Sequence, residues 1–253
     1  MQPWEHAVPA VLYKYVPPER IHVLSDCRVR FSQRTVFEDS HELQPDYAIF
    51  GTESEIWRYA LSIGFRLKRG GLSASDMVAA MAGSPKAQKL GIEALQKNIK
   101  ARDELGIFCL TEAADCDQMW TEYADKGKGF VISFATAHAG FERLKTPGRL
   151  GRVFYSDEPV GSALATILNN EAAGELFRKR MSYAFEREWR SVRMLHRLES
   201  CPGGVFLSPF DPASVREIII RPDCTVEANL QQLVADDQRY KHVPIIPQIV
   251  KPR

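Results

Sequence analysis

The segment FEREWRSVRM, residues 185–194, has two glutamates and an arginine at alternate positions: Glu186, Glu188 and Arg190. We expect this segment to form a β-strand, which would place Glu186, Glu188 and Arg190 on one face. Three charged groups on one strand face cost free energy unless they are solvated, paired or functional. An ionised carboxylate there could stabilise an oxocarbenium-like transition state. A ladder of ion pairs on an edge strand would explain the same pattern.

Aromatic residues form two further groups that could bind a ligand. One is Tyr13-Lys14-Tyr15, in an apolar run near the start of the chain, and the other is Trp120 with Tyr123. Aromatic faces can hold a flat heterocycle, although aromatic side chains also serve as core. Combined with one carboxylate, they favour the cleavage of a glycosidic bond.

These groups need elements to position them, and residues 106–134 supply the central ones. The apolar run 106–110 predicts a buried strand, and 130–134 predicts the strand that follows. Between them Met119, Trp120, Tyr123 and Ala124 are three or four residues apart, which places them on one helix face. The glycines at 127 and 129 are typical of the end of such a helix.

The remaining pattern predicts a single α+β domain, 1–253, with a mixed, mostly antiparallel sheet and flanking helices. A helical insertion at about 52–102 begins with a capping box formed by Thr52 and Glu55. A long helix is expected from Asp157 to Met181, and another helix at 225–233. In the strand 185–194, Trp189 should be buried on the face opposite Glu188. The expected strands are 11–16, 27–32, 106–110, 130–134, 151–155, 185–194, 215–220 and 243–250.

Composition excludes several classes of protein. The 253 residues carry 33 Lys and Arg against 32 Asp and Glu, and the net charge of +1 gives no general attraction for nucleic acid or membrane. Five cysteines have no zinc-type spacing, and with no secretory segment evident they favour reduced thiols in the cytoplasm. Neither a phosphate-binding loop of the Walker type nor a dinucleotide-binding GxGxxG motif is present. No metal site is expected.

Three blocks resemble a bacterial family known as domain of unknown function 2971. They are LYKYVPPERIHVLSDCRVRFSQRTVFEDSHE, MWTEYADKGKGFVISF and EREWRSVR, and they span residues 11–220 in the family's order. The usual Asn-Asp-Pro-Phe-Glu of the family is here Glu38-Asp39-Ser40-His41-Glu42. Because Asn and Pro are lost, the role of this acidic loop in the family does not carry over directly.

The order of these elements is also similar to that of ADP-ribosyltransferases, which have a His-Tyr-Glu plan. The resemblance implies a split, mixed sheet with NAD as substrate in its cleft, a macromolecular acceptor and a toxin or phage-defence role. It implies that Lys14 stands where the family has His, that Tyr123 stacks near the nicotinamide and that Glu188 is catalytic. We expect the rest of the NAD site to comprise Tyr13, Tyr15, Arg30, Ser32, Trp120 and Arg190.

Two alternatives stay open at this point. The chain could keep this fold as a non-catalytic interaction or regulatory module. It could also be a metal-dependent nuclease or hydrolase that uses Asp39, Glu42, Glu186 and Glu188. Convergence of Lys14, Tyr123 and Glu188 on one cleft would favour the transferase.

Overall fold

The structure is a computed structural model that describes residues 3–37, 47–49, 51–52, 54–55, 58, 102–141, 149–162 and 174–248. It has the expected α+β class, with a mixed, mostly antiparallel open sheet. The helices are α1 (His22–Ser25), α5 (Asp117–Tyr123) and α8 (Glu227–Asp236). The strands are β1 (Val11–Val16), β2 (Arg28–Gln33), β3 (Tyr47–Ile49), β4 (Leu105–Thr111), β5 (Phe130–Ala135), β6 (Arg149–Arg152), β7 (Phe154–Tyr155), β8 (Val160–Ser162), β9 (Arg178–Lys179), β10 (Glu188–Met194), β11 (Glu199–Cys201), β12 (Val205–Pro209), β13 (Val215–Ile220) and β14 (Ile245–Pro247).

Short 3-10 helices connect many of these elements. They are η1 (Pro3–Glu5), η2 (Pro18–Arg20), η3 (Arg34–Val36), η4 (Asp125–Gly127), η5 (Ala139–Phe141), η6 (Gly174–Phe177), η7 (Met181–Glu186), η8 (Leu195–Arg197), η9 (Pro212–Ser214) and η10 (Gln238–Tyr240).

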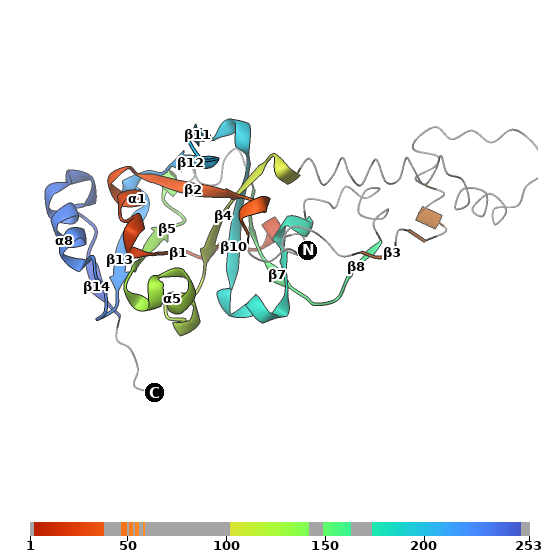
Figure 1. The fold of residues 1–253 in the computed structure, drawn as a ribbon, viewed down its shortest axis with the longest axis horizontal. Coiled ribbons are helices and arrows are strands. Elements are labelled where there is room, and N and C mark those ends of the chain that lie inside the picture. The colour runs from red at the N-terminus through yellow and green to blue at the C-terminus, as the bar shows by residue number, and fades with distance from the viewer. Residues whose placement is uncertain are drawn as a thin grey trace, which may run out of the picture.

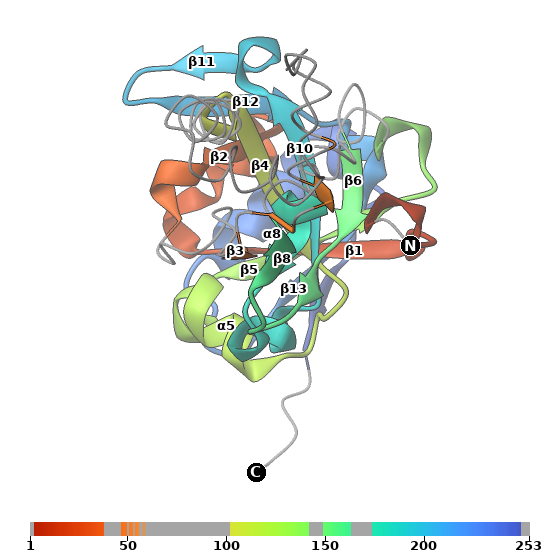
Figure 2. The same ribbon diagram turned by 90° about the vertical axis from the view of Figure 1, so that its right-hand side faces the viewer.

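Within the described ranges, ten strands form one sheet whose main path runs β11-β12-β2-β4-β1-β5-β13-β14. β10 pairs with β4 over its whole length, from Glu188 opposite Thr111 to Met194 opposite Leu105, and β6 pairs with β10. Among the strands that the structure describes in this sheet, β13 and β14 are the one parallel pair; β3 with β8 and β7 with β9 form separate parallel pairs. Figures 1 and 2 show β10 and β4 side by side near the middle of the molecule.

Both faces of the sheet carry a core because strand side chains alternate between them. On one face, Leu24 of α1 and Leu230 of α8 pack in the same cluster as Leu12 and Ile132. On the other face lies α5, whose Trp120 meets the Tyr15 ring edge-on, with 5.2 Å between the ring centroids. Figure 1 shows α1 and α8 on one side of β1 and β13 and α5 on the other.

The sheet divides along one edge of β4. At the start of that edge β2 pairs, with Ser32 opposite Ile107, and at its end β1 pairs, with Tyr13 opposite Thr111. The registers of β1 and β2 leave the stretch 108–110 between them. The two strands therefore diverge from a common neighbour.

The expected long helix from Asp157 to Met181 is wrong in the parts that the structure describes. That range instead holds β8, η6 and β9, with residues 163–173 outside the described part. The strands β8 and β9 are fixed by parallel pairing with β3 and β7, which are distant in the chain. A helical pattern in the local sequence gives no information about such a distant strand partner.

Several element boundaries also differ from expectation. β10 begins at Glu188, not at residue 185, and β14 covers only Ile245–Pro247. The run 151–155 divides into β6 and β7. The Val153 amide still donates to the Glu188 carbonyl at 2.8 Å, but the Glu188 amide donates to the Tyr155 hydroxyl, and β7 pairs with β9 instead of β10.

Most of the expected insertion at 52–102 and the acidic loop at 38–42 lie outside the described residues. The capping box is confirmed: the Thr52 amide donates to Glu55 Oε2 at 2.8 Å, and the Glu55 amide donates to Thr52 Oγ1 at 3.4 Å. None of the helices that the structure describes is long and apolar enough to cross a membrane.

Candidate functional site

Four charged side chains are buried together at the start of β10. Lys179, Glu186, Glu188 and Arg190 are each less than 9% exposed. Arg190 forms a bidentate pair with Glu188, with Nε donating to Oε1 at 2.8 Å and Nη2 to Oε2 at 3.0 Å. Its Nη1 donates to the Leu176 carbonyl at 2.7 Å. Such planar, charge-assisted geometry is the strong form of a carboxylate pair.

Lys179 joins the two glutamates. Its Nζ donates to both carboxylate oxygens of Glu186, at 2.7 and 2.9 Å, and lies 3.6 Å from Glu188 Oε2. Two cations therefore balance two carboxylates, which is how buried charge is tolerated. We refer to Lys179, Glu186, Glu188 and Arg190 as the charge cluster.

A backbone turn brings Glu186 into this cluster. Glu186 ends η7, and Arg187 then adopts a left-handed conformation with φ of 43° before β10 starts. Thr111 Oγ1 donates a hydrogen bond to the Glu186 carbonyl at 2.5 Å, and the Glu112 amide donates to the Arg187 carbonyl at 3.2 Å. Glu186 is thus not on the strand as expected, although its carboxylate still lies beside that of Glu188.

Two tyrosines complete the surroundings of the cluster. Tyr123 at the end of α5 donates its hydroxyl to Glu186 Oε1 at 2.5 Å. Tyr155 accepts a hydrogen bond from the Glu188 amide at 2.8 Å. Tyr123 is 39% exposed while both glutamates are only 3% exposed, so its ring connects the cluster to solvent.

The two carboxyl groups have different acidities. Burial alone would raise the pKa of Glu188, but the charges of Arg190 and Lys179 outweigh it and lower this pKa to about 2. Burial, followed by the neighbouring charge of Glu188, raises the pKa of Glu186 to about 7. Burial and the charge of Glu186 also raise the pKa of Tyr123. Glu188 is therefore ionised at neutral pH, as expected from its position near Arg190.

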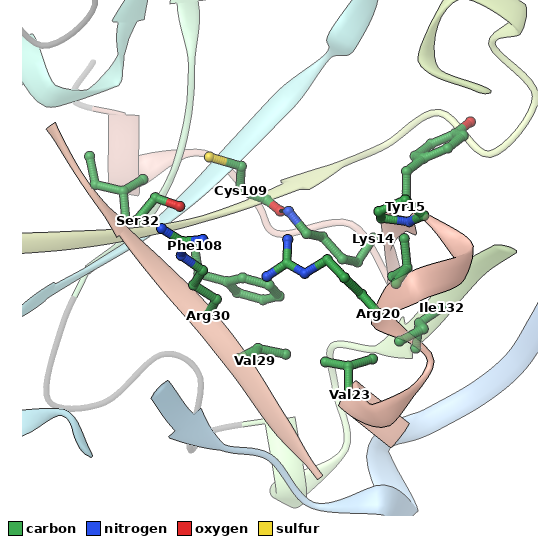
Figure 3. A pocket seen from close by; sticks show the side chains of 13 residues that line it. Lys14, Tyr15, Arg20, Val23, Val29, Arg30, Ser32, Phe108, Cys109 and Ile132 are labelled. Atoms are coloured by element: carbon green, nitrogen blue, oxygen red, sulfur yellow. Dashed lines mark hydrogen bonds between the residues drawn. The ribbon is translucent and has the colours of Figure 1, made fainter. Parts of the chain in front are cut away.

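A cleft opens where β1 and β2 diverge from β4. Its internal volume is about 60 Å³, and it is partly open to solvent. Figure 3 shows Lys14, Arg20 and Arg30 reaching into it from β1, η2 and β2. Its lining residues are Lys14, Tyr15, Val16, Pro17, Arg20, Val23, Val29, Arg30, Ser32, Ile107, Phe108, Cys109 and Ile132.

Lys14 occupies the divided edge of β4. Its Nζ donates to the Cys109 carbonyl at 2.9 Å and lies 5.3 Å from the centre of the Phe108 ring. The ammonium thus satisfies a backbone acceptor at the point where neither β1 nor β2 pairs with β4. Burial lowers the pKa of Lys14, while the charges of Glu188 and Glu186 oppose this shift.

Cys109 connects the cleft with the charge cluster. It lines the cleft and its carbonyl binds Lys14, while its thiol hydrogen-bonds the Glu188 carboxylate. In the ladder it stands opposite Arg190. The two sites therefore lie on either side of a single residue of β4.

The residues predicted for one NAD site are divided between these places. Glu188, Arg190 and Tyr123 belong to the charge cluster and its contacts, whereas Lys14, Arg30 and Ser32 line the cleft. The residues that line the cleft do not include Tyr123 or Glu188. The predicted residues therefore do not converge on one pocket but belong to two neighbouring sites.

The predicted stacking role of Trp120 is wrong. Its side chain is fully buried in the core, where Nε1 donates to the Ala114 carbonyl at 3.1 Å and Arg221 covers the ring. Tyr15 donates its hydroxyl to the Ala113 carbonyl at 2.9 Å, and Figure 3 shows its ring turned away from the cleft. Tyr13 packs beside this aromatic core. These aromatic side chains therefore hold α5 on the sheet.

Sequence reasoning missed Arg20, Cys109, Lys179 and Tyr155. Arg20 ends the short helix η2, two residues after the proline pair that follows β1. Lys179 fell inside the expected helix 157–181, and Tyr155 fell at the end of the expected strand 151–155, so no local signal placed them near Glu188. Among the described residues, no group of three or more His, Cys, Asp and Glu side chains could hold a metal. Asp39 and Glu42 of the nuclease alternative lie outside that part of the chain.

A family model described as "Protein of unknown function (DUF2971)" matches residues 119–191. The match runs from α5 to β10 and confirms the resemblance to this family over that part of the chain. No curated protein and no solved structure matches the chain.

Proposed function

We propose that the protein binds NAD in the cleft between β1 and β2 and cleaves the bond between nicotinamide and ribose. The ADP-ribosyl group would pass to a macromolecule or to water. The observation that carries this proposal is the position of an ionised, buried carboxylate directly across β4 from a cationic cleft. Cys109 lines the cleft and hydrogen-bonds Glu188, so a single residue of β4 separates a ligand in the cleft from this carboxylate.

Glu188 has the charge that this reaction needs. As the bond between the ribose C1′ and the nicotinamide nitrogen breaks, its electron pair leaves with nicotinamide and positive charge develops on the ribose. A carboxylate fixed in a buried site stabilises that charge without reorganising. The acceptor oxygen or nitrogen then bonds to C1′ and releases its proton to solvent.

The decisive experiment is Glu188→Gln, which keeps the shape of the side chain but removes its charge. We expect a folded protein that still binds NAD and loses turnover by a factor of at least ~100. Glu186→Gln is the matched control, because it changes the other glutamate of the same cluster and should lose much less. Equal NAD turnover by wild type and Glu188→Gln at matched folding would exclude this function. Labelled NAD incubated with cell lysate would identify the acceptor.

One observation favours a non-catalytic binding module as the second candidate. Both carboxylate oxygens of Glu188 are already bonded to Arg190, and the residue is only 3% exposed. An ion-pair network with this geometry can serve structure alone. NAD that binds without being cleaved by the wild-type protein would support this candidate against the transferase.

A further inference from the structure

Three cations from three different elements face the cleft, and its lining contains no carboxylate. Lys14 comes from β1, Arg20 from η2 and Arg30 from β2. Arg20 and Arg30 have no ion pair among the residues that the structure describes, and the Arg30 Nε is buried without a hydrogen-bond partner. The cleft therefore has an excess of positive charge.

Most of the buried cations outside the cleft are paired with a carboxylate. Arg190 is paired with Glu188, Lys179 with Glu186, and Arg102 with Glu175. The exception among the described residues is Arg193, which lies over the Phe31 ring and donates to Ser208 Oγ. The cleft differs from all of these places because it gathers three cations without a carboxylate in its lining. Unbalanced guanidinium groups in a concave, partly buried place are typical of a site for an anion.

The cations of the cleft also oppose each other. Burial and the charge of Arg30 lower the pKa of Arg20, so the two guanidinium groups lie close enough to repel. Apolar side chains of Val23, Val29 and Ile132 line the same space and limit screening by water. A multiply charged anion would relieve this repulsion, whereas a singly charged ligand would relieve less of it.

We infer that the cleft between β1 and β2 binds a ligand with two adjacent phosphate groups, held by Arg20, Arg30 and Lys14. Each guanidinium can donate two hydrogen bonds to one phosphate, and Lys14 keeps N–H donors beyond its bond to Cys109. The Ser32 hydroxyl is a further donor on the cleft wall. This deepens the proposed function and rests on the same cleft, since NAD carries two adjacent phosphate groups, but it depends on the charges of the cleft and not on any action of Glu188.

Titration calorimetry of the full chain with inorganic pyrophosphate, ADP, AMP and NAD tests the inference. We expect pyrophosphate and ADP to bind, AMP to bind at least ~10-fold more weakly, and salt to weaken all of these interactions. If ADP binds much more tightly than pyrophosphate, the ligand is a nucleotide; equal affinity indicates that the phosphates alone are recognised. No binding of pyrophosphate or ADP at millimolar concentration would overturn the inference.

Arg20→Gln and Arg30→Gln should each weaken pyrophosphate binding by about 10- to 100-fold. Arg28→Gln is the matched control, since Arg28 is on β2 two residues before Arg30, pairs with Glu199 at the surface and does not line the cleft. Equal weakening by Arg28→Gln would show that the effect is general charge and would overturn the inference.

The thermal midpoint separates binding from a structural role. Without added anion and at low salt, Arg20→Gln should unfold at the wild-type temperature or above it, because one like charge is removed. Pyrophosphate should raise the midpoint of the wild type but not that of Arg20→Gln. A variant that unfolds well below wild type without anion would show that Arg20 is structural and would overturn its role.

NAD turnover separates this inference from the proposed function. If the wild-type protein binds pyrophosphate but does not cleave NAD, the phosphate site is supported and the transferase function is excluded. If Arg20→Gln and Arg30→Gln cleave NAD with unchanged KM, the transferase function stands and the phosphate site is overturned.

Discussion

Glu186 and Glu188 are separated by a single residue, yet their surroundings shift the two carboxyl groups in opposite directions. Arg190 binds both oxygens of Glu188, whereas Glu186 has only Lys179 and the neutral hydroxyl of Tyr123. With Glu188 already ionised, a second charge at Glu186 is costly. Opposite shifts in neighbouring carboxyl groups commonly mark sites where the two groups have separate roles.

The raised pKa of Glu186 predicts that the protein loses stability as pH rises. Between the ordinary value of 4.5 and about 7, the folded protein keeps a proton that the unfolded chain releases. The free energy of unfolding should therefore fall across this range, by about 3 kcal/mol at most from this group. Urea unfolding of wild type and Glu186→Gln at about pH 5 and about pH 8 measures the effect.

The difference in unfolding free energy between wild type and Glu186→Gln should shrink or reverse at the higher pH. Glu122→Gln is the control, because Glu122 is exposed on α5, where its carboxylate accepts a hydrogen bond from Gln118. A pH-independent difference for Glu186→Gln would show that its carboxyl titrates normally.

Removal of the bridging cation should destabilise the charge cluster. Lys179→Met leaves two buried carboxylates with Arg190 alone, at an expected loss of about 3–5 kcal/mol near pH 8. The loss should be smaller near pH 5, where Glu186 takes up a proton. Lys128→Met is the control: Lys128 and its partner Asp125 are about half exposed, so this pair should contribute less than ~1 kcal/mol. Equal losses in urea unfolding would contradict a structural role for Lys179.

At the scale of elements, local patterns predicted the central strands well. The runs 11–16, 106–110, 130–134 and 215–220 became β1, β4, β5 and β13 with boundaries that differ by one residue at most. These strands have either continuous apolar runs or a clear alternation of apolar and polar residues, and these patterns directly predict which side chains are buried. Failures came where partners are distant, as in β8 and β9, or where backbone conformation changes abruptly, as at Arg187 with its φ of 43°.

The alternation of β10 correctly predicted that Trp189 is buried opposite the charge cluster. Trp189 is 1% exposed, and its Nε1 donates to Glu112 Oε1 at 2.7 Å. Trp189→Ala should cost on the order of 3–5 kcal/mol in urea unfolding because it creates a core cavity. Phe154→Ala, at a ring that is 51% exposed, should cost less than ~1 kcal/mol. A wild-type midpoint for Trp189→Ala would mean that the two faces of β10 are reversed.

At the scale of the whole molecule, the sequence identified candidate site residues but could not show which of them lie next to one another in the fold. Lys14 is partly buried and Glu188 is buried, and they reach Cys109 from different sides of β4. Which strands neighbour β4, and where β1 and β2 diverge from it, depends on pairing between residues far apart in the chain, such as Ser32 with Ile107 and Tyr13 with Thr111. Such long-range pairing leaves no local trace, which is why Arg20 and Cys109 were not predicted.

The cleft depends on how the N-terminal strand meets the rest of the sheet. β1 lies between β4 and β5, and its last residue, Val16, pairs with Phe130 directly after the turn from α5. At Gly129 in that turn, a Cβ atom would lie 2.1 Å from the Val16 carbonyl oxygen and 3.0 Å from the Pro17 Cα. Only glycine allows this approach, which also sets the start of the Pro17–Arg20 segment beside the cleft.

Gly129→Ala should therefore damage both stability and the cleft. The methyl group meets backbone that is fixed by the β1–β5 ladder, so we expect a loss of about 3 kcal/mol in urea unfolding, together with weaker pyrophosphate binding. Gly203→Ala is the matched control. Gly203 has a φ of +75° and no heavy atom within 4 Å of the place that a Cβ atom would take, so this variant should lose only about 1 kcal/mol through backbone strain and leave binding unchanged. Equal losses for the two variants would show that β1 can shift to accept the methyl group and that the close contact at Val16 does not set the cleft.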